Sequence, residues 1–281
     1  MMKYGNLHLH STFSDAQFTP KQLFMIGKSL GYRALALTDH ETDGGVRELM
    51  DYAREQGGVD IISGIEFYGK HGDGPALHLT ALDYDMDDPG LRAFVKERVE
   101  TRYEFTKRGF DLGVERGIIQ DITWDEVMQF CGENTWVCHD QIFNAIRLLR
   151  RAMPERSSIV SGIFKFPEML PLKPKHPTAE QVIKVVRKAG GIIALAHPYK
   201  QTHLVGELVD MGLNGIEVSH PDNRENTSSL AIEAAKTYNL YHCGGTDHTG
   251  AMSGCDGKLC TVALQGVTEE EYMIIKERRR G

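Results

Sequence analysis

"KYGNLHLHSTFSDAQFTPKQLFMIGKSLGYRALALTDH", residues 3–40, holds an apolar run with a polar tip, a helical segment, and a second apolar run with its own polar tip. In the helical segment Thr19 is a predicted N-cap, Pro20 takes the first helical position and Gln22 completes a capping box. Gly31 is expected to end this helix. The succession of strand, helix and strand is typical of β-α units, whose strands lie parallel to one another.

Apolar runs of this kind recur along the chain and predict seven strands. They are YGNLHLH (4–10), YRALALTDH (32–40), VDIISGIEF (59–67), ALHLTALDY (76–84), GIIALAHP (191–198), NGIEVSH (214–220) and LYHCGGTD (240–247). Helical patterns lie between most of them, and Thr178 with Gln181 forms a second capping box. Seven units in an α/β chain favour a barrel over an open sheet. In such barrels the functional residues lie at the carboxyl ends of the strands.

The chain departs from this pattern between about residues 85 and 176. This stretch contains helical patterns without strand patterns and ends in the proline-rich PEMLPLKPKHP (167–177). We therefore expect a barrel domain of residues 1–84 and 177–281, with residues 85–176 as a helical insert domain that caps the substrate.

The composition is that of an ordinary globular protein, with 41% hydrophobic and 25% charged residues. Its 32 basic and 39 acidic residues give a net charge of -7, which disfavours binding to long nucleic acids but allows a local phosphate site. No apolar run approaches the ~20 residues that cross a bilayer, and no signal peptide is evident. The five cysteines contain no C-x-x-C pair and are expected to be reduced thiols in a cytoplasmic protein.

Nearly every predicted strand delivers a histidine or a carboxylate to the same rim. The candidate metal ligands are His8, His10, Asp15, His40, Glu66, His78, His197, Asp247 and His248. In the H-x-H of the first strand both imidazoles point to one face, because side chains alternate along a strand. A single histidine at a strand end more often has a structural role, but the whole set predicts a metal site. Imidazoles with carboxylates suit zinc, manganese or iron.

Nine candidate ligands are too many for one ion, so two or three divalent ions are expected. Three such ions would outweigh the negative charges of Asp15, Glu66 and Asp247 and leave a cationic pocket. A phosphate group is the substrate that this charge favours. Ions that share a carboxylate can support hydrolysis by a bridging hydroxide.

The motifs HLHSTFSD, ALTDHETDG, SGIEF, IALAHP and GGTDH together resemble those of the polymerase and histidinol phosphatase (PHP) family. The resemblance covers residues 6 to about 250 and implies a distorted seven-stranded TIM-like barrel. It also implies a first ion held by His8, His10, Glu66 and Asp247, a second by Glu66, His78 and His197, and a third by Asp15, His40 and a late histidine. The family usually has D-x-H at the last motif, whereas this chain has Asp247-His248-Thr249, so the third site departs from the pattern.

Catalytic roles are expected for Glu66 and Asp247 as ligands, with His220 as the acid that protonates the leaving group. Lys200, His203, Arg224 and His139 are candidate substrate contacts, whereas His71, His176 and His242 are expected to be structural.

The predicted function is hydrolysis of phosphate monoesters of a small metabolite, with a nucleotide 5'-monophosphate or 3',5'-bisphosphate favoured. Alternatives within the family are a 5'-3' exonuclease on short RNA, a cyclic sugar-phosphate phosphodiesterase, a histidinol-phosphate phosphatase and a protein-tyrosine phosphatase. A non-catalytic metal-binding module is the alternative of another class. The sequence leaves the oligomeric state open.

Overall fold

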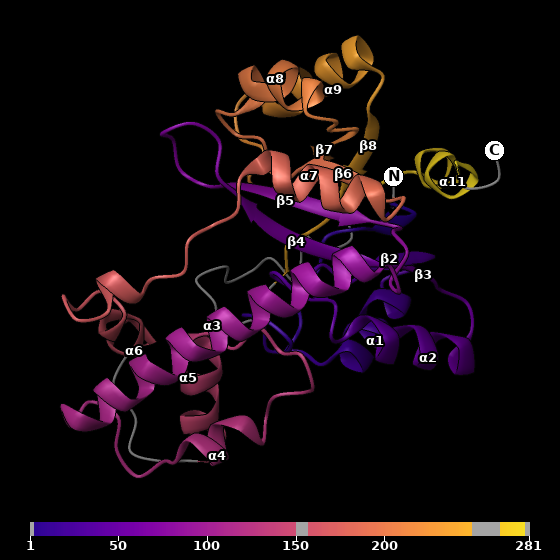
Figure 1. Ribbon diagram of the computed structural model, residues 1–281. Helices are drawn as coiled ribbons and strands as arrows, with labels where there is room; N and C mark the ends of the chain where they lie inside the picture. Colours follow the sequence, from indigo (N-terminus) through magenta and orange to yellow (C-terminus); the bar gives the residue numbers. More distant parts are fainter. Residues whose placement is uncertain (1–2, 150–156, 249–264, 279–281) are drawn as a thin grey trace.

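The computed structural model describes residues 3–149, 157–248 and 265–278, whose strands form two sheets (Figure 1). The parallel first sheet contains β1 (Gly5–Asn6), β2 (Ala34–Ala36) and β3 (Asp60–Ile62). The second contains, in spatial order, β4 (Gly64–Gly69), β5 (Leu77–Leu82), β6 (Ile192–Leu195), β7 (Gly215–Ser219) and β8 (Tyr241–Gly244). Strands β6, β7 and β8 are parallel, whereas β5 is antiparallel to both of its neighbours.

Backbone contacts join the two sheets at both edges. A bridge pairs His40 with Glu66, and the N–H of Leu7 donates to the carbonyl of Gly244 over 3.0 Å. At the second edge a Cβ on Gly245 would stand 2.3 Å from the backbone nitrogen of His8, so only glycine allows this approach. The polar segments that follow β1, β2 and β8 are thereby held beside β4.

The predicted α/β class is confirmed, but two details of the predicted barrel are wrong. The run 59–67 is not one strand, because it divides at Ser63 into β3, which pairs with β2, and β4, which pairs with β5. Strand β5 is antiparallel because only residues 70–76 connect it to β4, and a parallel pairing would need a longer crossover. The described strands therefore number eight, in two sheets, and a closed seven-stranded barrel is not confirmed.

The helices that pack around the sheets begin where the sequence predicts. Both capping boxes are present: Thr19 with Gln22 opens one helix and Thr178 with Gln181 another. These helices bury leucine and valine side chains in a shared core with the inner strands. The helices around the sheets are α1 (Pro20–Ser29), α2 (Val46–Gln56), α7 (Ala179–Lys188), η2 (Thr202–Leu204), α8 (Val205–Asp210), α9 (Thr227–Tyr238) and α11 (Glu269–Glu277). Of these, α11 packs in a separate cluster, with Tyr272 and Ile275 against the first strands.

The described part of residues 85–176 contains helices and no strand. Its elements are α3 (Pro89–Glu115), α4 (Trp124–Met128), α5 (His139–Leu148), α6 (Ser157–Ile163) and η1 (Leu170–Leu172). Phe110, Val127 and Ile142 belong to a hydrophobic cluster made only of residues from this stretch. Figure 1 shows α4, α5 and α6 gathered to one side of the sheets, with α3 leading to them.

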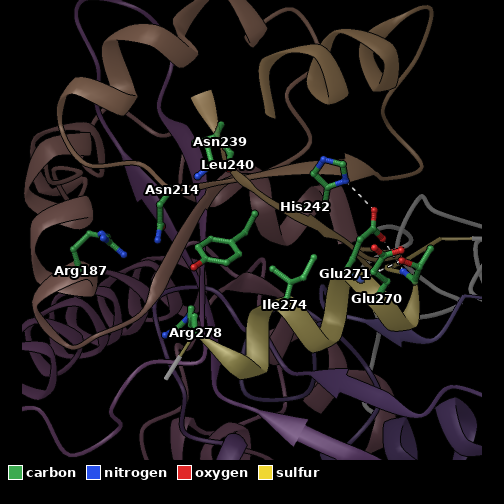
Figure 2. A pocket seen from close by; sticks show the side chains of 11 residues that line it. Arg187, Asn214, Asn239, Leu240, His242, Glu270, Glu271, Ile274 and Arg278 are labelled. Atoms are coloured by element: carbon green, nitrogen blue, oxygen red, sulfur yellow. Dashed lines mark hydrogen bonds and ion pairs between the residues drawn. The ribbon is translucent and has the colours of Figure 1, made fainter. Parts of the chain in front are cut away.

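A cavity of about 960 Å³ lies where strands β7 and β8 begin, against α11 (Figure 2). Asn214 and Leu240, which line it, directly precede these strands, whereas the predicted site residues follow their carboxyl ends. The cavity is therefore separate from the predicted site.

No described helix combines the length and the apolar character that a membrane crossing requires. Cys131, Cys138 and Cys243 are free thiols, and Cys255 and Cys260 lie outside the described residues.

Candidate metal centre

The carboxylate of Glu66, on β4, lies at the centre of a cluster of histidines and is 1% exposed. Five imidazoles approach it: His8 and His10 from the segment after β1, His40 and His197 from those after β2 and β6, and His78 from β5. The distances to Oε1 are 3.0 Å from His78 Nδ1, 3.2 Å from His197 Nε2 and 3.4 Å from His8 Nε2; those to Oε2 are 3.0 Å from His40 Nδ1 and 3.4 Å from His10 Nε2. One buried carboxylate therefore faces five nitrogen donors.

Pairs of ring nitrogens also face each other within this cluster. His8 Nε2 lies 3.2 Å from His10 Nε2, and His78 Nδ1 lies 3.1 Å from His197 Nε2. Two neutral imidazoles that present lone pairs to each other repel, unless a proton or a cation lies between them. Donors about 2.1 Å from a shared ion stand roughly 3.0–3.4 Å apart, which matches these spacings. The arrangement thus fits divalent metal ions.

Two aspartates complete the cluster. Asp247 Oδ1 lies 3.1 Å from His10 Nε2, and Asp15 Oδ2 lies 3.5 Å from His40 Nε2. Eight of the nine predicted ligands are thereby brought together from six separate segments. Three overlapping donor groups among the described residues consist of predicted ligands alone: His8, His10 and Glu66; His10, Asp15 and His40; and Glu66, His78 and His197. A fourth group, which shares His8, adds Glu217 and His220.

His248 is the predicted ligand that the structure places elsewhere. Its ring stacks on Phe18, with centroids 5.6 Å apart, and belongs to none of the donor groups. Because Asp247 and His248 are adjacent, their side chains point in different directions. The Asp247 side chain points into the cluster, toward His10. That His248 supplies the third site therefore stays a prediction, one that these contacts do not support. Thr249, at the register position of the D-x-H histidine, lies outside the described residues.

A carboxylate that the sequence reasoning missed holds two of the ligands in place. Glu217, on β7, is fully buried and accepts a hydrogen bond from His8 Nδ1 over 2.7 Å. Its other oxygen accepts from the backbone N–H of His197 over 2.8 Å. Because Nδ1 of His8 is the donor, Nε2 keeps its lone pair directed at the cluster. The sequence did contain one signal for this residue, because a glutamate between the apolar Ile216 and Val218 of a buried strand is unusual.

Asp39 has a supporting role as well. It accepts hydrogen bonds from the hydroxyl groups of Ser11 and Ser14, each over 2.6 Å, and from the backbone N–H of Ser11. These bonds fix the turn that carries Asp15 toward His40.

Two site residues, His197 and Asp247, have positive φ angles of 30° and 50°, a strained conformation typical of functional sites.

Charge couples the members of the cluster. Burial lowers the pKa of His8, but Glu217, Glu66 and Asp247 outweigh it, so the pKa lies well above its usual value. Burial likewise raises the pKa of Glu66, yet the surrounding histidines hold it well below the usual range. The pKa of Asp247 is lowered in the same way, against burial, chiefly by His8. The carboxylates are thus ionised and can act as metal ligands.

His220 lies beside the cluster, and its backbone hydrogen bond determines which ring nitrogen carries the proton in the neutral form. Its Nδ1 accepts the backbone N–H of Asp222 over 3.0 Å, so in the neutral ring the proton resides on Nε2. Nε2 lies 3.4 Å from Asp247 Oδ2, yet it makes no hydrogen bond to any described residue. A buried N–H is therefore directed at the cluster, and the carboxylate of Asp247 is the acceptor nearest to it.

The stretch 85–176 forms one wall beside the cluster. The Trp136 ring lies 5.5 Å from that of His40, and its backbone N–H donates to Phe13 over 2.8 Å. His139, at the start of α5, has a pKa that is lowered mainly by burial, while the charge of Asp15 opposes this shift. His139 also forms a donor group with Cys138 and Asp140.

The remaining predicted contacts lie on the loops after β6 and β7. Lys200 Nζ lies 5.0 Å from the Tyr199 ring, and Arg224 lies 6.0 Å from the same ring. His203, in η2, is exposed to solvent. The two loops therefore meet at Tyr199, next to the strands that deliver His197 and His220.

Comparisons with known proteins agree with this geometry. The model of the PHP domain matches residues 6–116. The phosphoribosyl 1,2-cyclic phosphate 1,2-diphosphodiesterase of Eggerthella lenta is 28% identical, over 87% of this chain and 94% of its own length. The 5'-3' exoribonuclease of Haemophilus influenzae is 25% identical, over 88% and 90% of the two chains. The 3',5'-nucleoside bisphosphate phosphatase of Chromobacterium violaceum is 26% identical, over 89% of each chain.

A crystal structure of a candidate metal-dependent phosphoesterase from Bifidobacterium adolescentis has a TM-score of 0.78 and 23% identity, and covers 98% of this chain and 96% of its own. That similarity concerns the fold. The chain thus contains a segment, residues 6–116, that matches the PHP domain, and it is similar over most of its length to enzymes named as phosphodiesterase, exoribonuclease and phosphatase.

Proposed function

We propose that this protein is a metal-dependent hydrolase that cleaves phosphate monoesters of a small phosphorylated metabolite. A nucleotide 5'-monophosphate or 3',5'-bisphosphate is the favoured substrate. The observation that carries the proposal is the Glu66 carboxylate with five imidazole nitrogens within 3.4 Å. Divalent ions held there would neutralise phosphate oxygens and lower the pKa of water.

The ligand assignment follows the donor groups. Manganese, iron or zinc would be held in two or three sites: the first by His8, His10, Glu66 and Asp247, the second by Glu66, His78 and His197, and the third by Asp15 and His40 with His10 nearby. Glu66 belongs to two of these sites, because its carboxylate lies within 3.4 Å of the histidines of both. The third site has fewer side-chain donors and is expected to bind most weakly.

The chain's own residues supply the proton that the leaving group needs. His220 carries its proton on Nε2, which points at the cluster, so it is our candidate for the acid that protonates the leaving alkoxide. Residues 85–176 would cap the substrate, with His139 facing it. Lys200, His203 and Arg224 would contact it from the loops after β6 and β7.

The test is phosphate release by protein prepared with manganese, iron or zinc, together with a count of bound ions. Suitable substrates are adenosine 5'-monophosphate, adenosine 3',5'-bisphosphate, histidinol phosphate, a phosphotyrosine peptide and a 5'-phosphorylated RNA dinucleotide. Glu66→Gln should abolish turnover with the fold intact, whereas Glu48→Gln, an exposed carboxylate near Lys21, should change nothing. Absence of turnover on every phosphoester with ions bound would favour a non-catalytic metal-binding module instead.

A 5'-3' exonuclease on short RNA is the second candidate. Three curated relatives carry the name 5'-3' exoribonuclease, and the ring of Tyr68, which is only partly buried, lies beside the cluster, where a base can stack. Release of 5'-mononucleotides from the dinucleotide, faster than phosphate release from adenosine 5'-monophosphate, would favour it.

A further inference from the structure

Tyr68 lies beside the candidate metal ligands, although it belongs to none of the donor groups. It follows Glu66 by two positions on β4, so the two side chains leave the strand on the same face. In the pairing of β4 with β5, Tyr68 stands opposite His78, and the two rings lie 4.6 Å apart with an angle of 85° between their planes. The strand that carries the central carboxylate therefore carries a phenol to the same side.

The ring of Tyr68 is held in place by further neighbours. It stacks on His40 with centroids 5.0 Å apart, and the His176 ring lies 5.0 Å away. The backbone N–H of Tyr68 donates to Glu41 Oε1 over 2.8 Å, and Glu41 is the residue next to His40 in the chain. A ring that is packed in this way keeps its hydroxyl group in a defined position beside His40.

The hydroxyl group of Tyr68 lies at the third donor group. Among the described residues its one hydrogen-bond partner is His40 Nε2, which is 3.4 Å away. Asp15 Oδ2 approaches the same nitrogen over 3.5 Å, so an ion shared by Asp15 and His40 would take the lone pair of Nε2. The phenol would then keep its proton and lose its acceptor. It would become a hydrogen-bond donor, held beside the ion, that is available to a ligand.

We propose that the Tyr68 hydroxyl group binds a non-bridging oxygen of the substrate phosphate at the metal centre. The inference rests on the proposed function and adds a substrate-binding residue to it. Phosphate oxygens are strong acceptors, and a neutral phenol has one proton to donate. A hydrogen bond to an anionic oxygen is shorter and stronger than one between neutral groups. Because this bond forms with the substrate and with the phosphate product alike, it contributes to binding more than to the chemical step.

The test removes only the hydroxyl group. Tyr68→Phe keeps the ring against His40 and His78, so the fold and the number of bound ions should match those of the wild type. In the ion-loaded protein the Kd for inorganic phosphate, measured by calorimetry, should rise about 10-fold. For the phosphoester that the wild type hydrolyses fastest, kcat/KM should fall by about the same factor, through KM. Tyr238→Phe, which alters a tyrosine that is 44% exposed on α9, is the matched control and should change neither value.

Phosphate binding separates this inference from the proposed function, because it requires no turnover. A Kd for phosphate in Tyr68→Phe within 3-fold of the wild-type value, or a wild type that binds no phosphate, would overturn the phosphate contact. Loss of an ion in Tyr68→Phe, counted by elemental analysis, would show that the hydroxyl group supports His40 instead and would overturn it too. A weakened Kd in Tyr68→Phe, together with a wild type that hydrolyses no phosphoester, would support the contact and refute the hydrolase.

Discussion

Glu217 and His8 form a fully buried carboxylate–imidazole pair, with 2.7 Å between Oε1 and Nδ1. The pair links β7 to the first segment of the chain and lies behind the metal centre. It sets which nitrogen of His8 faces Glu66, because the bonded Nδ1 must carry the proton. A candidate metal ligand is thus oriented by a buried carboxylate behind it.

The first prediction concerns this pair. Glu217→Gln should keep the fold but lower metal affinity by about 10- to 100-fold, because a neutral amide no longer fixes the His8 tautomer or supports its basicity. Competition with a chromogenic chelator measures the affinity. Glu207→Gln is the matched control, since Glu207 pairs with His71 over 2.9 Å on the surface. Equal affinities in both variants and the wild type would refute the orienting role.

The second prediction concerns the last motif. His248→Gln should leave the number of bound ions unchanged, because the His248 ring stacks on Phe18 outside the donor groups. His40→Gln should remove one ion, because His40 lies 3.0 Å from Glu66 and 3.5 Å from Asp15. Elemental analysis after gel filtration counts the ions. Loss of an ion in the His248 variant, with His40→Gln unaffected, would reverse our assignment.

The third prediction concerns stability without metal. Ions at 100 times their Kd should stabilise the fold by about 2.7 kcal/mol, so chelation should lower Tm by roughly 5–10 °C. In Glu66→Gln the chelation effect should be much smaller. Scanning calorimetry with and without chelator provides the values, and an unchanged wild-type Tm would show that the cluster holds no ion in solution.

The metal-free protein should also respond to pH in a defined direction. Burial lowers the pKa values of His8, His40 and His197, but it is outweighed by nearby carboxylates, and for His40 first by Tyr68 and then by Asp15 and Glu66, so all three are raised. Groups with raised folded-state pKa values stabilise the fold at pH below about 6.5, and this contribution is lost as pH rises through the folded-state values. The Tm of metal-free protein should therefore fall from pH 6 toward alkaline pH. A flat or rising profile would contradict this coupling.

Sequence patterns predicted which side chains lie together better than they predicted the strand arrangement. The structure brings the H-x-H pair, Glu66 and Asp247 together, and polar residues at strand ends are conspicuous against apolar runs. The antiparallel β5 was missed, because a strand's direction depends on its connection and not on its own residues. His248 lies against Phe18 instead, because a shift of one position along the chain turns a side chain to another face.

The last prediction concerns the cavity away from the metal centre, where Glu271 of α11 accepts from His242 over 2.8 Å (Figure 2). Burial raises the pKa of Glu271, but hydrogen bonds from His242 and Thr268 outweigh it and hold the pKa at about 2. A lowered carboxyl pKa contributes stability above pH 4.5 that is lost as pH falls toward 2. Because the Glu271 side chain is partly exposed, we expect Glu271→Gln to reduce the free energy of unfolding by only about 1–2 kcal/mol at pH 7. Urea titrations at pH 7 and pH 3 test this, with Glu270→Gln as the exposed control in the same helical turn. The difference between Glu271→Gln and the wild type should shrink at pH 3, and a constant difference would mean that packing, not charge, holds α11 against β8.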